Sequence, residues 1–194
     1  MNEHTSPAFW PARGSLHEGR AFVLKEDVIF TVLAQEGGIS WMNGRHPQSG
    51  GSFIIATAVS DEEEERATRL LKNEFALRDR LHDGWAIRPV ATTQYRGRFA
   101  LVYAPFCFEL LACRAGKAIS GIARFIEMAI RICGPLRQMH QHNLIHGDIK
   151  PGAIFVHHDA TCRLCSFGLS CGTSDAFSQS RLAASGGTPA YMSP

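Results

Sequence analysis

Residues 157–171 contain five histidine and cysteine side chains, which are residue types that bind zinc. Two adjacent histidines, His157 and His158, precede cysteines at positions 162, 165 and 171. Cys-x-x-Cys is a zinc-ligand spacing, so one hypothesis is a zinc-binding module that uses Cys162 and Cys165. If both cysteines lie on one extended strand, however, a separation of three residues puts their side chains on opposite faces. We therefore favour buried thiols, with the zinc-binding module as an alternative.

Two longer stretches suggest a different chemistry. Residues 144–151 read Leu-Ile-His-Gly-Asp-Ile-Lys-Pro, residues 187–194 read Gly-Thr-Pro-Ala-Tyr-Met-Ser-Pro, and Ser-Phe-Gly lies between them at 166–168. In this order and spacing they resemble the catalytic loop, the end of the activation segment and the D-F-G motif of Ser/Thr protein kinases. The resemblance implies that Asp148 is the catalytic base position, Lys150 a phosphate-facing cation, and Thr188 their contact in the activation segment.

The positions that hold metal in kinases are changed. There, Mg²⁺ is bound by the Asp of D-F-G and by the Asn five residues after the catalytic Asp; here these are Ser166 and Ala153. A hydroxyl is a poor Mg²⁺ ligand compared with a carboxylate, and an alanine side chain offers no ligand at all. We therefore expect no metal site. Gly147 also replaces the Arg of H-R-D, so a phosphorylated activation segment would lose its usual anchor.

The resemblance also assigns nucleotide-binding positions, again in degenerate form. Gly37 and Gly38 resemble part of the glycine-rich loop, although such a pair is also typical of a simple hairpin turn. The third-strand lysine of kinases falls near Thr57, yet the strand predicted around it contains no lysine. Glu74 resembles the glutamate of the small-lobe helix, and Tyr103 resembles the gatekeeper before the hinge. The usual lysine–glutamate pair is therefore not expected.

Hydrophobic patterning predicts the elements that must position these residues. β-Branched and aromatic runs predict strands, and apolar residues at steps of three and four predict helices. The predicted strands are 27–33, one starting at 39–42, 53–59, 85–92 and 98–103; the predicted helices are 60–81 and 119–140; a hairpin is predicted at 154–165. This order predicts an α+β, protein-kinase-like two-lobe fold, with a small antiparallel β lobe carrying one helix and an incomplete helical lobe.

The predicted organisation is a poorly ordered leader at 1–20, a small lobe at 21–103 and a partial large lobe at 104–194. The helices that follow the activation segment in kinases would come after residue 194, so a natural truncation and a fragment of a longer chain are both open. Residues 73–81, 85–90 and 99–105 are also loosely similar to kinase-like domains at the front of large bacterial multidomain sensor proteins.

Composition indicates a soluble globular protein, with 45% hydrophobic and 20% charged residues. A net charge of +2 gives no reason to expect a nucleic-acid or anionic-membrane partner. The start has no signal-peptide pattern, and no apolar run approaches the roughly 20 residues that span a bilayer. We therefore expect a cytoplasmic protein whose six cysteines are reduced thiols, mostly buried.

The function that these residues predict is that of a pseudokinase with a regulatory or scaffolding role. Mg-ATP binding should be weak or absent and no cofactor is required. The partner would be another protein or the rest of a larger polypeptide. The alternative is an active Ser/Thr kinase, or a fragment of one, that uses ATP and Mg²⁺ and phosphorylates protein through Asp148.

Overall fold

The computed structural model describes residues 24, 27–115, 121–174 and 187–192, and the predicted leader at 1–20 lies outside them. The chain divides into two compact units. The first comprises Met1–Thr68 and Pro89–Phe106, and the second comprises Arg69–Arg88 and Cys107–Pro194. No helix among the described residues is both long enough and apolar enough to cross a membrane.

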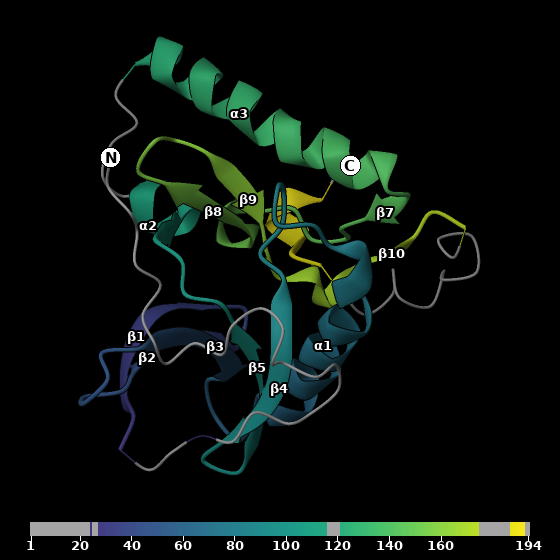
Figure 1. Ribbon diagram of the computed structural model, residues 1–194. Coiled ribbons are helices and arrows are strands. Elements are labelled where there is room, and N and C mark those ends of the chain that lie inside the picture. The colour runs from purple at the N-terminus through teal and green to yellow at the C-terminus, as the bar shows by residue number, and fades with distance from the viewer. Residues whose placement is uncertain (1–23, 25–26, 116–120, 175–186, 193–194) are drawn as a thin grey trace. The chain divides into compact units, whose positions relative to one another are not determined.

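The first unit is built on a five-stranded antiparallel sheet (Figure 1). Its strands are β1 (Ile29–Glu36), β2 (Ile39–Arg45), β3 (Ser52–Ala58), β4 (Pro89–Tyr95) and β5 (Arg98–Tyr103), in the order β1-β2-β3-β5-β4. Alternation along the strands gives one face of the sheet an apolar cluster around Phe53, Ile55 and Val102. The predicted antiparallel β lobe is therefore confirmed.

The predicted fourth strand was wrong at its start. It was expected from Trp85, but β4 begins at Pro89. Residues 82–86 instead form a turn in which the Trp85 and Ala86 N–H groups donate to the His82 carbonyl oxygen. The Trp85 side chain is buried in the core of the second unit, so its burial there, and not a strand, explains the apolar pattern.

Helix α1 (Glu64–Ala76) follows β3 and carries Glu74, as predicted, but it is shorter at both ends than the expected 60–81. At its start, the Glu64 N–H donates to the Asp61 carbonyl oxygen, and the Asp61 carboxylate accepts a hydrogen bond of 3.0 Å from Arg98 Nε. Residues 59–63 are thus a turn held by the sheet of the first unit. At its end the chain tightens into a 3-10 turn at Arg78–Arg80.

The second unit combines short strands with one long helix. A three-stranded sheet has the order β6 (Phe108–Leu110), β8 (Ile154–His157) and β9 (Cys162–Leu164), and β7 (Leu144–Ile145) pairs with β10 (Cys171–Gly172). Helix α2 (Leu111–Ala115) follows β6, and α3 (Ile122–Gln141) lies along β9 (Figure 1). The predicted second helix is confirmed within the described residues, as is the predicted hairpin, which is β8–β9.

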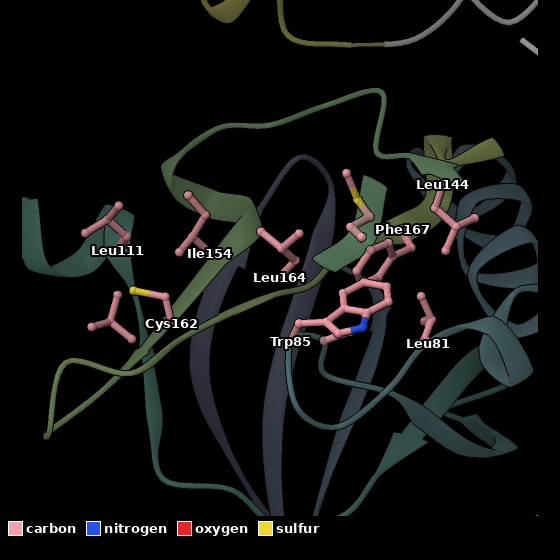
Figure 2. Close-up of a cluster of buried hydrophobic side chains, with 11 residues drawn as sticks. Leu81, Trp85, Leu111, Leu144, Ile154, Cys162, Leu164 and Phe167 are labelled. Atoms are coloured by element: carbon pink, nitrogen blue, oxygen red, sulfur yellow. The ribbon is translucent and has the colours of Figure 1, made fainter. Parts of the chain in front are cut away.

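One apolar core holds this unit together. Figure 2 shows Trp85 next to Phe167, with Leu144 and Leu81 beside them and Leu111, Ile154 and Cys162 at the other end of the cluster. From α3, Met139 is buried, and Met128, Ile132 and Leu136 pack against the cluster from partly buried positions. The loops that leave β7 and β9 are therefore anchored on a packed core.

Candidate functional site

Three predicted site residues meet in the second unit. Lys150 Nζ lies 2.9 Å from Asp148 Oδ2 and donates a hydrogen bond of 2.9 Å to Thr188 Oγ1. The Thr188 N–H donates to Asp148 Oδ1 at 2.8 Å, across 40 residues of sequence. Each of the three residues contacts the other two. The residues that the sequence predicted to be in contact therefore lie together.

These contacts set the ionisation of the carboxylate. Burial opposes the charged form of Asp148, but the hydrogen bonds from Lys150 and Thr188, with the Lys150 charge, outweigh it and lower the pKa of Asp148. The carboxylate is therefore ionised at neutral pH. Both of its oxygens are engaged, one by the lysine and one by a backbone N–H.

His146 holds the loop that follows β7 and carries Asp148. Its Nε2–H donates to the Cys165 carbonyl oxygen at 2.9 Å, and its Nδ1 accepts the Asp148 N–H at 3.3 Å. These two bonds require the neutral ring with its proton on Nε2. Burial lowers the pKa of His146 to about 4, which agrees with a neutral ring. The ring centroid lies 5.0 Å from that of Phe167.

The sequence did not predict the hydrogen bonds that the Asn73 side chain on α1 makes to the segment after Phe167. Asn73 Nδ2 donates to the carbonyl oxygens of Gly168 and Ser170, at 3.0 and 3.1 Å. The Ser170 hydroxyl in turn donates to the His146 carbonyl oxygen at 2.9 Å. Asn73 therefore ties the segment after Phe167 to the helix. The only signal in the sequence was an amide next to Glu74, and nothing local distinguishes it from a surface asparagine.

The backbone is left-handed at two positions of the site. Gly147 has φ of +83°, and a Cβ added there would lie 2.6 Å from the Leu169 carbonyl oxygen. Ser166 has φ of 63° and ψ of 51° although it carries a side chain. Only glycine avoids the steric cost of the first conformation at this close approach. The second resembles the strained backbone found at many functional sites.

The other predicted nucleotide positions lie on the sheet of the first unit and on α1. Gly37 and Gly38 form the two-residue turn between β1 and β2, both with positive φ, as primed hairpin turns require. Thr57 lies on β3, and its hydroxyl donates to the Phe99 carbonyl oxygen at 2.9 Å. Tyr103 ends β5 and is fully buried against Trp41. Glu74 belongs to the second unit and is 1% exposed.

The zinc-binding alternative relies on Cys162 and Cys165, which the sequence favours as buried thiols. Among the described residues, the group of three possible metal ligands is His157, His158 and Asp159, which includes no cysteine. The Cys162 thiol faces Met128 Sδ and the Ala160 carbonyl oxygen, whereas the Cys165 thiol faces the Gly152 carbonyl oxygen. Burial raises the pKa of the Cys162 thiol, which disfavours the metal-binding thiolate.

The expectation of mostly buried thiols is only partly right. The structure describes all six cysteines, and no disulfide joins them. Cys162 and Cys165 are buried and Cys171 is intermediate, but the cysteines at 107, 113 and 133 are exposed. Their positions on the outer surface of the second unit depend on packing that the sequence pattern alone does not reveal.

A comparison with protein-family models decides the family. The model of the protein kinase domain matches residues 51–194, which is most of the chain. The chain belongs to the protein kinase family. The sequence prediction is thereby confirmed at the level of the family and of the fold.

Curated relatives of this kinase domain are serine/threonine kinases. A probable serine/threonine-protein kinase of Dictyostelium discoideum is 31% identical over 36% of this chain and 5% of its own length. The kinase KDX1 of Saccharomyces cerevisiae is 32% identical over 34% of this chain and 17% of its own length. The DNA damage-responsive kinase RqkA of Deinococcus radiodurans is 32% identical over 38% of this chain and 11% of its own length. The matched region is therefore a small part of each relative.

Within the kinase frame, the two metal-holding positions carry no carboxylate or amide. Ala153 is fully buried, and its carbonyl oxygen accepts the Cys165 N–H at 3.0 Å. Ser166 is partly exposed, and its hydroxyl lies 3.7 Å from Cys165 Sγ. Asp148, Lys150 and Thr188 thus occupy the predicted catalytic positions, and Ala153 and Ser166 occupy the two positions predicted to hold Mg²⁺ in kinases.

Proposed function

We propose that this kinase domain is a pseudokinase with a regulatory or scaffolding role, which binds Mg-ATP weakly or not at all. The observation that carries the proposal is the pair of changed metal positions. Ala153 presents a buried methyl group, and Ser166 presents a single hydroxyl beside a thiol. Phosphoryl transfer depends mainly on metal ions and cations that position the phosphates and neutralise their charge, so these two changes remove what the reaction needs.

The retained residues fit a structural role as well as a chemical one. Lys150 contacts Asp148 and Thr188 at once, and the Thr188 N–H completes the group. These charge-assisted bonds hold residues 187–192 against the loop after β7. These contacts would give a pseudokinase a fixed surface for a partner protein, and this role needs no phosphoryl transfer.

An active Ser/Thr kinase is the second candidate, and the intact Asp148–Lys150–Thr188 group favours it. The Asp148 carboxylate is ionised and could accept a proton from a substrate hydroxyl. Activity through Asp148 would then require a metal-bound nucleotide held without the usual aspartate and asparagine. The proposal and this alternative differ in their dependence on Mg²⁺.

Nucleotide binding with and without Mg²⁺ tests the proposal. We expect ATP affinity of the unmodified chain to be unchanged by Mg²⁺. Ser166→Asp restores one carboxylate at a partly exposed position and should create Mg²⁺-dependent binding. Ser166→Asn is the matched control, with the same shape and no charge. Ala153→Asn enters a fully buried site and should destabilise the fold by about 1–3 kcal/mol, so the double variant is informative only where it stays folded.

Phosphoryl transfer is measured in the same series with labelled ATP. We expect no transfer to the chain itself or to a generic protein substrate. Magnesium-dependent autophosphorylation by the unmodified chain, lost in Asp148→Ala, would establish the active kinase and overturn the pseudokinase proposal.

A protein partner, or the rest of a larger polypeptide, is part of this proposal. The first half of α3 exposes apolar side chains: Ile122 is 78% exposed, Phe125 61% and Ile130 67%. Exposed apolar surface of this kind is typical of interaction sites. A cytoplasmic location and the similarity to bacterial sensor proteins stay predictions from the sequence.

A further inference from the structure

The turn between β8 and β9 brings three metal-binding side chains together outside the kinase site. One ligand-type atom from each of His157, His158 and Asp159 lies within 4.8 Å of the other two. His157 Nδ1 is 3.0 Å from Asp159 Oδ1, and the centroids of the two imidazole rings are 3.8 Å apart. Two nitrogen donors and one oxygen donor therefore converge at the tip of this hairpin.

The hairpin backbone fixes the three residues on one turn. The His157 N–H donates to the Thr161 carbonyl oxygen at 2.9 Å, and the Ala160 N–H donates to the His157 carbonyl oxygen at 3.0 Å. The Thr161 N–H donates to Asp159 Oδ1 at 2.8 Å, which orients the carboxylate toward the histidine side of the turn. The backbone of the turn is therefore already ordered, so binding of a metal ion costs little further backbone entropy.

His157 is the anchored member of the group. Its ring centroid lies 5.0 Å from that of Phe108 on the neighbouring strand β6, and its carbonyl oxygen accepts a 3.3 Å hydrogen bond from Arg114 Nη1. His158 and Asp159 are exposed. The Asp159 carboxylate is held by the Thr161 N–H, whereas the His158 side chain can rotate, so the turn offers two held ligands and one adjustable ligand.

The distances between the ligand atoms suit a tetrahedrally coordinated ion. Zinc bonds to histidine nitrogen and carboxylate oxygen are about 2.0–2.1 Å, so neighbouring ligand atoms lie roughly 3.3 Å apart. The 3.0 Å between His157 Nδ1 and Asp159 Oδ1 is close to this value. The His158 ligand nitrogen lies within 4.8 Å of the other two ligand atoms, and rotation of this exposed side chain can bring it to the same spacing.

We propose that His157, His158 and Asp159 bind one divalent transition-metal ion, with Zn²⁺ as the natural occupant and water as its fourth ligand. Two imidazoles and a carboxylate are a ligand set that zinc accepts, and cobalt binds the same kind of site. The ion would bridge the last residue of β8 and the turn that follows it. The inference does not depend on the proposed pseudokinase function, and it uses neither Cys162 nor Cys165.

Metal titration of the full chain, purified without a histidine tag, tests the site. Co²⁺ is the probe because its visible absorption reports coordination, and Zn²⁺ is then added to displace it. We expect one equivalent to bind with an absorption typical of four-coordinate nitrogen–oxygen ligation. His158→Ala and Asp159→Asn should each weaken binding by more than the roughly 10–100-fold that loss of an outer-shell partner costs.

A second histidine pair supplies the matched control. The His82 and His142 rings have centroids 4.5 Å apart in the same unit but belong to no three-ligand group among the described residues. His82→Ala should leave the Co²⁺ affinity unchanged. The proposal is overturned if no saturable equivalent binds, if His82→Ala weakens binding as much as His158→Ala, or if both substitutions in the turn leave it intact. Far-UV circular dichroism confirms that each variant keeps its fold.

Discussion

Asn73 connects α1 to the segment after Phe167, and its removal should weaken the second unit. Asn73→Ala removes two hydrogen bonds, to the carbonyl oxygens of Gly168 and Ser170, which are themselves buried residues. At about 1 kcal/mol net for each bond, the loss should be about 2 kcal/mol of unfolding free energy. That is a large part of a typical domain margin of roughly 5–15 kcal/mol.

The assay is urea unfolding followed by circular dichroism, together with hydrogen exchange of the backbone around Ser170. Asn73→Ala should lower the urea midpoint and speed exchange in that segment. Arg69→Ala is the control, because Arg69 is exposed on the same helix and its removal should change stability by less than about 0.5 kcal/mol.

Asn73→Asp gives a sharper test with the same side-chain shape. An ionised carboxylate cannot donate, and it would face two carbonyl oxygens at the present 3.0 and 3.1 Å. This variant should be less stable than Asn73→Ala at neutral pH and should recover on acidification, when the protonated acid can donate one bond. The reasoning is refuted if Asn73→Ala and Arg69→Ala unfold alike, or if acid gives Asn73→Asp no relative recovery.

Three further outcomes follow from the same unit. Gly147→Ala should destabilise the fold by about 1–2 kcal/mol or more, since its φ is +83° and the new Cβ would meet the Leu169 carbonyl oxygen; an unchanged thermal midpoint would contradict this. Because the pKa of His146 is about 4 in the folded chain and 6.5 in its reference state, the unfolded chain binds more protons between these values. Stability should therefore fall as pH drops from about 6.5 to about 4, by roughly 3 kcal/mol in total, and His146→Leu should flatten this slope in urea titrations. Finally, the apolar side chains of α3 should make the isolated chain marginally stable, dye-binding or associated, because a few hundred Å² at about 25 cal/mol per Å² rivals a domain margin; Phe125→Ser with Ile126→Ser should reduce dye binding, and a monomer with a sharp high-temperature transition would argue against this.

Much of the fold could be predicted because its signals are local. The run around Ile54 and Ile55 is β-branched and buried, so β3 follows from its own residues. The apolar spacing from Ile122 to Met139 specifies a helix in the same way. The pairing of these strands into one antiparallel sheet and the family itself followed from the order of elements and from the motifs at 144–151 and 187–194.

Local signals failed where a residue serves a distant partner. Trp85 looks like the start of a strand, yet it packs on Phe167, with ring centroids 5.9 Å apart. Residues 60–63 look like the first turn of a helix, yet Asp61 turns instead to Arg98 on β5. In both cases a contact made by a residue far along the chain outweighs the local helix or strand preference, which is worth less than about 1 kcal/mol per residue.

The sequence by itself determined the family, most strands of the first sheet, the β8–β9 hairpin and the long helix, because these depend on neighbouring residues or on motifs. It also predicted that Ser166 and Ala153 stand where kinases place their Mg²⁺ ligands. Only the tertiary structure decided that Asn73 clamps carbonyl groups 95 and 97 residues away. Only the tertiary structure showed that ligand atoms of the neighbours His157, His158 and Asp159 lie within 4.8 Å of one another and that this group includes no cysteine. The Asn73 contacts join residues that only folding brings together, so no local pattern of residue types encodes them. The three metal-ligand types in the turn are neighbours in sequence, but the direction of their side chains depends on the folded hairpin.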